Sequence, residues 1–355
     1  MDNSVQNKKY TFSQFVMKVI NGATAGILVA VIPNAIFGEI FINLTPLWEG
    51  FNTLEGIVQV IQFLMPVLIG VGVGLQFNLN PMQLMSVGGA SFIASGNVIR
   101  VEDTWHIVGI GDTVNAMLIA GIATWIVLRI GDKLATLATI AYSTVIAAGV
   151  GAIGVFILPY VSYITEFLGQ VVASATDLQP IIMSIIIGIL FAILILTPIS
   201  VVAIAMAISL SGFASGAANL GLVAVVVFMA MGSAFAKNEF GVTLSIILGG
   251  VKSTMPNFFA NLKIAIPVIL TSGFMGALAP ILNIQGTPAS AGLGFAGLVG
   301  PIVAYDYLEY NAIINILILL LVYLIIPILI CLFAHWLCIN VIKVTKVSDY
   351  KINLK

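Results

Sequence analysis

Long apolar runs alternate along the chain with short stretches that hold charge, proline, or clusters of glycine and asparagine. A helix that crosses a bilayer needs about 20 mostly apolar residues, and ten runs serve as candidates. The third and seventh of these runs are short and rich in small residues. The pattern predicts an all-α integral membrane protein with about ten transmembrane helices. The runs are 23–44, 56–76, 81–98, 113–130, 135–160, 178–197, 199–213, 217–236, 264–283 and 311–340.

Two stretches fit neither an ordinary span nor a loop. Residues 237–263 hold only about ten mostly apolar positions, Val242 to Val251, which is too short to cross. Residues 286–305 carry glycine and proline throughout. Because each stretch must begin and end on one side, we expect two re-entrant hairpins, one from each face, with the first turning near Gly249, Gly250 and Lys252. Non-helical backbone at this depth must be buried in protein or lie beside water, so the hairpins imply a cavity.

The basic residues give the orientation, since lysine and arginine in short loops stay on the cytoplasmic side. Counting through ten spans places nearly all basic residues inside and most acidic residues outside, with Arg100 as the basic exception. We therefore expect a multi-pass protein of the plasma membrane with both termini in the cytoplasm. The inside group is Lys8, Lys9, Lys18, Arg129, Lys133, Lys237, Lys263, Lys343, Lys346, Lys351 and Lys355; the outside group is Glu39, Glu49, Glu55, Glu102, Asp103, Glu166, Asp177, Asp306 and Glu309.

The content of the spans suggests three parts. Residues 1–176 hold mostly continuous spans and form a predicted scaffold or interface part that starts with an amphipathic helix over residues 10–20. Residues 177–310 concentrate prolines and both hairpins, as expected of a transport part. Residues 311–355 are the last transmembrane helix and a cytoplasmic tail. A second interfacial helix is predicted over residues 161–176.

Composition narrows the function. Only 8% of the 355 residues are charged, 60% are hydrophobic and the mean hydropathy is +1.16, which excludes a soluble globular fold and makes the lipid bilayer the first partner. No basic stripe exists to bind nucleic acid. Neither catalytic residues nor a metal site can be assembled from the sequence, and no cofactor is implied. Cys331 and Cys338 are interpreted as small apolar residues of the last span.

Glu239 is the first candidate for a solute contact. An ionisable group at membrane depth costs on the order of 2.5–3.5 kcal/mol and so calls for a reason. Glu239 stands at the mouth of the first hairpin, where a carboxylate can accept hydrogen bonds from a hydroxylated solute or take up a proton. The alternative is a solvated loop carboxylate paired with Lys237.

Polar residues of both hairpins complete the predicted solute site. Those of the first hairpin either coordinate a solute or cap helix ends. In the second hairpin, exposed backbone amides of residues 286–294 suit an oxygen-rich ligand, although the glycines also allow close packing. The candidates besides Glu239 are Asn238, Lys252, Ser253, Thr254, Asn257, Thr287, Ser290 and Gly292.

The segments NEFG at 238–241 and AGLGFAGLVGP at 291–301, in a chain with two hairpins, resemble the EIIC family of the bacterial phosphotransferase system. More narrowly, the chain is similar to the EIIC-like membrane proteins of the perfringolysin-regulator type. The resemblance implies a glucose-superfamily EIIC fold with ten spans in a homodimer, in which a transport domain carries the sugar as a rigid unit. In that family a hairpin Glu, which Glu239 would match, and a His hold the sugar, and EIIB phosphorylates it.

The sequence departs from that family pattern in two ways. No histidine stands near either hairpin along the chain, and no EIIA or EIIB region is attached. Three functions stay open. The first is an elevator-type permease for a small polar, sugar-like solute; the second is a membrane sensor or regulator that does not transport. The third is a sugar-phosphotransferase permease that works with separate EIIA and EIIB proteins.

Overall fold

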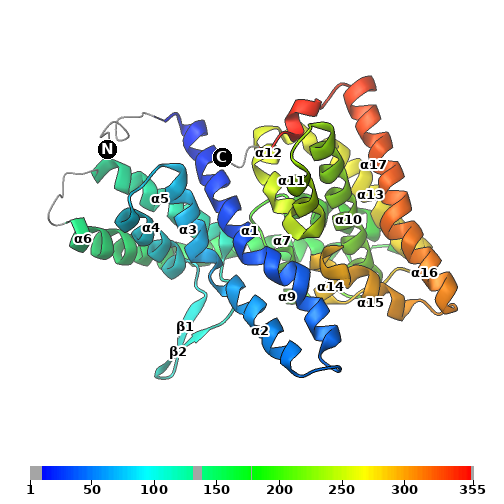
Figure 1. Ribbon diagram of the computed structural model, residues 1–355, viewed down its shortest axis with the longest axis horizontal. Helices are drawn as coiled ribbons and strands as arrows, with labels where there is room; N and C mark the ends of the chain where they lie inside the picture. The colour runs from blue at the N-terminus through cyan, green and yellow to red at the C-terminus, as the bar shows by residue number, and fades with distance from the viewer. Residues whose placement is uncertain (1–9, 131–137, 177, 353–355) are drawn as a thin grey trace. The chain divides into compact units, whose positions relative to one another are not determined.

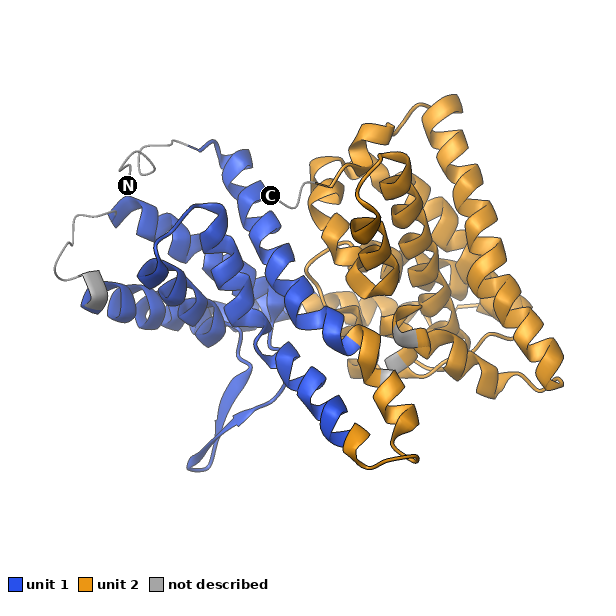
Figure 2. Cartoon of the chain, in the orientation of Figure 1, with its two compact units in different colours: residues 1–34, 52–164 blue, residues 35–51, 165–355 orange. Residues whose placement is uncertain are grey.

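The protein is described here by a computed structural model covering residues 10–130, 138–176 and 178–352 (Figure 1). The chain forms two compact units (Figure 2): unit 1 is Met1–Asn34 with Asn52–Ile164, and unit 2 is Ala35–Phe51 with Thr165–Lys355. The last helix thus falls in the same unit as both predicted hairpins. The scaffold and transport roles assigned to 1–176, 177–310 and 311–355 stay predictions. Outside the description are Lys8, Lys9, Lys133, Asp177, Lys355 and the side chain of Glu39.

The described residues of unit 1 form helices, the loops that join them and one small β-ribbon that the sequence pattern did not predict. Strands β1 (Val98–Val101) and β2 (Thr104–Ile107) pair antiparallel. Buried small and branched residues form the core of unit 1. Hydrogen bonds lie within this core as well: Asn115 Nδ2 donates to the carbonyls of Ala94 and Gly154, at 2.6 and 3.0 Å. The helices are α1 (Phe12–Leu44, continuing into unit 2), α2 (Gly50–Phe63), α3 (Met65–Gln76), α4 (Pro81–Ala94), α5 (Thr113–Ile130), α6 (Ala138–Ala141), a π-helical stretch (Tyr142–Val150) and α7 (Gly151–Ala175, also continuing into unit 2).

Unit 2 is built around α10 (Gly212–Phe235), which is buried along most of its length. The other helices of unit 2 lie before and after it in the chain, and several of them are short. They are α8 (Pro180–Ile195), α9 (Val201–Ala207), α11 (Phe240–Ser245), α12 (Met255–Ala260), α13 (Ala265–Ile281), α14 (Pro288–Leu293), α15 (Val299–Tyr307), α16 (Ala312–Leu320) and α17 (Ile326–Trp336); π-helical stretches (Leu321–Ile325 and Leu337–Val341) follow α16 and α17.

Among the described residues, six helices are long and apolar enough to cross a membrane. The pair α2 and α3, bent by 49°, makes a seventh candidate, and α8 is a shorter apolar helix. Several predicted elements differ. The run 199–213 contains only the seven-residue α9, about 10 Å long and too short to cross. The predicted interfacial helices over 10–20 and 161–176 are not separate, because α1 and α7 continue through them.

Close packing of α8, α10 and α13 depends on glycine. A Cβ on Gly221 of α10 would collide with the backbone carbonyl of Gly188 in α8, and a Cβ on Gly276 of α13 would collide with the carbonyl of Ser184. Lipid is as apolar as a leucine side chain, so helices in a membrane associate through such close contact rather than through the hydrophobic effect. The three helices therefore form the rigid centre of unit 2.

We expect Gly221→Ala to lower the thermal stability of the detergent-purified protein, because the backbone of α8 must move away. Gly241→Ala is the matched control: it also lies in a helix, α11, and a Cβ there would meet nothing within 4 Å. Alanine is favoured over glycine in a helix by about 1 kcal/mol, so the control should be neutral or stabilising. Thermal unfolding of both variants measures the difference, and equal melting temperatures would contradict this packing.

Candidate functional site

The first hairpin, residues 237–263, has two short helical arms and a sharp turn. Its first arm is α11 followed by a π-helical turn (Ile246–Gly250), and its second is a 3-10 turn (Val251–Thr254) followed by α12. Gly249 lies at the tip with φ of 113°, a conformation that glycine adopts without strain. The turn falls where the sequence predicted it.

The second hairpin, residues 286–305, is broken in a similar way. Its arms are α14 and α15, joined by a 3-10 turn (Ala296–Leu298). Backbone breaks occur at Gly294 and Leu298, both with φ of 60°. The glycine and proline content that predicted an interrupted helix therefore corresponds to a real interruption.

The two hairpins are anchored at opposite ends of α10. At its C-terminal end, the Ser233 and Thr243 hydroxyls share a hydrogen bond of 2.9 Å that ties α11 to α10. At its N-terminal end, Ser215 Oγ donates to the carbonyl of Thr287 at 2.6 Å, and Gly212 pairs with Gly286. Figure 1 shows α11 and α12 near one end of α10 and α14 and α15 near the other. A helix of 24 residues is about 36 Å long, so the anchors are far apart.

The hairpin tips nevertheless meet. A Cβ placed on Gly249 would lie 2.8 Å from the Cβ of Ala35 in α1 and 3.6 Å from the Cβ of Ala296, so the first tip lies against α1 and close to the second tip. On the α10 side, Gly294 packs against Leu222, while Ile246 belongs to the same buried cluster as Val225. Both tips thus reach the middle third of α10 from opposite ends.

Glu239 and Asn238 lie at the start of the first arm, away from the tip. The Glu239 side chain is exposed at the N-terminus of α11 and has no hydrogen-bond or ion-pair partner among the described residues, so the alternative pairing with Lys237 is not seen. Asn238 is committed elsewhere: its Nδ2 donates to Ser233 Oγ and to the carbonyl of Tyr350. Of the two, only Glu239 is free to meet a solute.

The second arm holds the polar groups nearest the tip. Lys252 Nζ donates to the carbonyls of Thr197 and Ile199, at 2.6 and 3.0 Å, where the chain is broken between α8 and α9. Ser253 is buried, and its Oγ has no partner among the described residues. Thr254 Oγ1 donates back to Val251, and Asn257 binds the C-terminal segment. Lys252 and Ser253 are therefore the candidates that the structure leaves available.

The candidates of the second hairpin have structural roles. Thr287 and Ser290 cap α14 reciprocally, each side chain accepting a hydrogen bond from the other residue's backbone N–H. A Cβ on Gly292 would collide with the backbone of Val202, so this glycine lets α14 approach α9. The capping and packing alternatives describe these three residues well, and the structure does not bring them to the tips.

Asn219 is a residue that the sequence analysis did not single out. It lies one turn before the middle of α10, is buried, and donates from Nδ2 to the carbonyls of Ser290 and Gly294, at 2.9 and 3.3 Å. These carbonyls flank the break between α14 and the tip. An asparagine inside an apolar span was the available signal, since a buried polar group in a membrane helix needs a partner.

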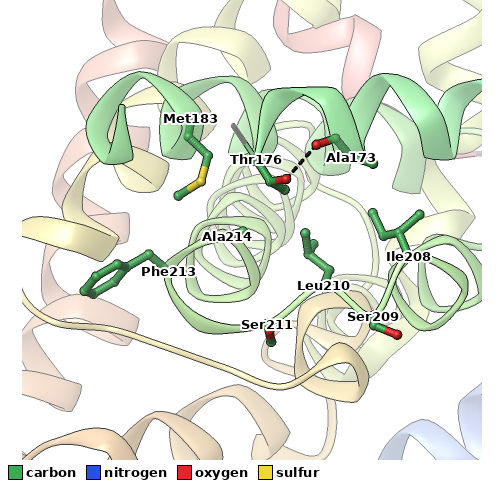
Figure 3. Close-up of a pocket in the computed structure, with 9 residues that line it drawn as sticks. All are labelled: Ala173, Thr176, Met183, Ile208, Ser209, Leu210, Ser211, Phe213 and Ala214. Atoms are coloured by element: carbon green, nitrogen blue, oxygen red, sulfur yellow. Dashed lines mark hydrogen bonds between the residues drawn. The ribbon is translucent and has the colours of Figure 1, made fainter. Parts of the chain in front are cut away.

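A cavity of about 300 Å³ lies at the N-terminal end of α10 (Figure 3). It is lined by the end of α7, the start of α8 and the segment that leads into α10. The dashed line in Figure 3 marks the hydrogen bond that the Thr176 hydroxyl donates to the carbonyl of Ala173. Its wall combines apolar side chains such as Met183 and Phe213 with the hydroxyl-bearing residues Thr176, Ser209 and Ser211. It is separate from the predicted solute residues, none of which lines it.

Searches of curated proteins and of solved structures give no match to this chain. The family model described as "Phosphotransferase system, EIIC" matches residues 17–352, nearly the whole chain. This match and the apolar helices of both units together show that the protein is a multi-pass membrane protein. The chain therefore belongs to the EIIC family of the phosphotransferase system, the membrane permease components for sugar transport.

Proposed function

We propose that this chain is an elevator-type permease that moves a small polar, sugar-like solute bound beside the meeting point of the two hairpin tips. The observation that carries the proposal is the contact of Gly249 with Ala296 near the middle of α10, with the hairpins anchored at its opposite ends. Broken helices that meet near mid-membrane are where transporters bind solutes, because the freed backbone groups and helix ends supply polar partners.

The orientation of unit 2 follows from its charges. Lys237 follows the C-terminal end of α10 and its carbonyl accepts a hydrogen bond from Lys351 Nζ, whereas Asp306 near the end of α15 and Glu309 just after it belong to the second hairpin and the segment that follows it. By the positive-inside rule, the lysine end faces the cytoplasm. The first hairpin then enters from the cytoplasm and the second from outside, and the C-terminus is cytoplasmic. Lys8, Lys9 and Lys18 favour a cytoplasmic N-terminus by the same rule.

The moving part in this proposal is unit 2, and unit 1 is the scaffold that pairs with a second copy in a homodimer. Lys252 and Ser253 face the solute at the tip, and Glu239 lies at the cytoplasmic mouth of the first hairpin, where an entering solute meets it. EIIC components work with EIIA and EIIB, so separate EIIA and EIIB proteins supply phosphorylation. The cytoplasmic end of unit 2 is where they would act.

The test is uptake of a panel of radiolabelled hexoses by proteoliposomes that hold the full chain, with and without phosphoenolpyruvate and the EIIA and EIIB proteins. We expect uptake of at least one hexose. Glu239→Gln should lower its initial rate of uptake about threefold, because one exposed charge-assisted hydrogen bond to the entering solute is lost at the hairpin mouth.

Each outcome of this assay separates the candidate functions. Uptake only with phosphoenolpyruvate identifies the sugar-phosphotransferase permease, and uptake without it identifies an independent transporter. Binding of a hexose without any flux would refute transport and leave the sensor. An unchanged rate of uptake in Glu239→Gln would remove Glu239 from the proposed solute path.

A further inference from the structure

The segment 344–352, which we name the C-terminal strap, lies across both arms of the first hairpin. Asn257 of α12 donates from Nδ2 to the carbonyls of Asp349 and Lys351, both at 2.8 Å. Asn238, just before α11, donates to the carbonyl of Tyr350 at 2.9 Å and accepts from the N–H of Ile352 at 3.2 Å. One short segment thus bridges the two ends of the hairpin, which lie about 20 residues apart in sequence.

A further tether joins the strap to the end of α10. Lys351 Nζ donates to the carbonyl of Lys237 at 2.9 Å and approaches that of Ala236 at 3.4 Å. These are the carbonyls that a helix end leaves without intrahelical partners. The strap therefore completes hydrogen bonding that α10 and the hairpin do not complete themselves.

Tyr350 is the buried anchor of the strap. Only 2% of its surface is exposed, and its ring lies against Phe228 and His335, with ring centroids 5.8 and 5.1 Å away. The ring occupies the space beside Gly232, where a Cβ would come within 2.6 Å of Tyr350 Cδ1. Glycine at this position of α10 is thus required for the tyrosine to be seated.

The other strap contacts are individually weak. They are hydrogen bonds to backbone groups at partly exposed positions, where each contributes little net stability because water competes for the same groups. Burial raises the pKa of the Tyr350 hydroxyl, so the anchor stays neutral at physiological pH and is released by movement rather than by deprotonation. A segment held by one buried ring and several weak bonds can detach without unfolding the helices beneath it.

We propose that the C-terminal strap is a latch: with Tyr350 seated it holds the two arms of the first hairpin together, and its release frees the hairpin to move. The consequence for transport rests on the proposed function, whereas the latch itself is measurable without any solute. The chain carries its own reporter. Cys338 is fully buried, and its carbonyl accepts hydrogen bonds from Val344 and Thr345 at the root of the strap.

The test compares wild type with Tyr350→Ala, using the purified full chain in detergent. We expect labelling of Cys338 by N-ethylmaleimide to rise about tenfold when the strap detaches, and deuterium exchange of residues 240–260 to rise about tenfold with it. Cys331 is the internal control, since it is also buried and donates to the carbonyl of Ala224 under α10 rather than under the strap. Its labelling, and exchange of residues 288–307, should not change.

Two more variants test other contacts of the latch. Gly232→Ala changes no residue of the strap, but its added Cβ displaces the Tyr350 ring from α10. Asn257→Ala removes both hydrogen bonds between the strap and α12. Gly232→Ala should reproduce Tyr350→Ala, and Asn257→Ala should raise exchange of residues 240–260 even with Tyr350 seated. If Cys331 is labelled in Tyr350→Ala, that variant has unfolded. Exchange of residues 240–260 in Asn257→Ala then tests the latch, and an unchanged exchange would contradict it.

Two results would overturn the latch. One is increased labelling of Cys338 in Tyr350→Ala together with unchanged deuterium exchange of residues 240–260. The strap would then have detached without freeing the first hairpin. The other is a protected Cys338 in both Tyr350→Ala and Gly232→Ala, because the strap would then not depend on its anchor. If the exchange rises as expected but hexose uptake by proteoliposomes is unaltered, the latch stands and the proposed transport role of the first hairpin fails.

Discussion

Asn219→Leu is expected to lower hexose uptake by proteoliposomes at least about tenfold per folded molecule. The wild-type amide holds the carbonyls of Ser290 and Gly294 on either side of the break in the second hairpin, and Leu has a similar branched shape but no donor. Loss of two buried hydrogen bonds costs about 1–3 kcal/mol. A misplacement of about 1 Å in a site can cost as much as a hundredfold in rate, so the functional loss should exceed the loss of stability.

The matched control is Asn115→Leu in unit 1. Asn115 is also buried, and its Nδ2 also donates to two backbone carbonyls. It should lose similar thermal stability, while uptake per folded molecule falls much less because both hairpins of the predicted solute site lie in unit 2. Equal effects on uptake would show that Asn219 acts only through general stability. Deuterium exchange confined to residues 288–307 in Asn219→Leu is the independent measurement.

The sequence was informative where composition forces a structure. Residues 286–305 hold so much glycine and proline that no continuous helix can form, and the structure breaks them at Gly294 and Leu298. Residues 237–263 hold too few apolar positions for a span, and the chain turns at Gly249. The EIIC family resemblance was confirmed over residues 17–352. Ten spans and membrane re-entry of the hairpins stay predictions.

The sequence was less informative about partners that are distant along the chain. Asn238 and Asn257 were singled out as polar residues of a hairpin, but their amides bind backbone about 110 and 90 residues away. His335 appeared remote from both hairpins, yet it stacks on Phe228 with ring centroids 4.0 Å apart and lies against the strap. Hydropathy records how apolar a residue is and not what it contacts. The same limit explains why α9 was taken for a span: composition did not show that the helix begins only after its N-cap Ser200 and ends before Ser209, which has φ of 50°.

Lys252→Met is expected to weaken hexose binding about tenfold to a hundredfold and also to lower the melting temperature. A hydrogen bond to a charged group contributes about 1.5–3 kcal/mol, and each 1.4 kcal/mol is tenfold in affinity. Lys252 Nζ uses two of its three N–H groups on Thr197 and Ile199, which leaves one for a solute oxygen. The two carbonyls lose their donor in the variant, so some stability is lost whether or not Lys252 binds a solute.

The opposite result would assign Lys252 a structural role. If it only caps the broken end of α8, Lys252→Met should lower the melting temperature and leave the hexose dissociation constant unchanged. Isothermal titration with the transported hexose and thermal unfolding of the same preparation measure both quantities. Lys263→Met is the control for loss of one positive charge, because Lys263 is exposed beside α13 and its Nζ has no hydrogen-bond or ion-pair partner among the described residues. Because the melting temperature falls under both roles, it is the hexose dissociation constant of Lys252→Met, compared with that of Lys263→Met, that separates a solute ligand from a helix cap.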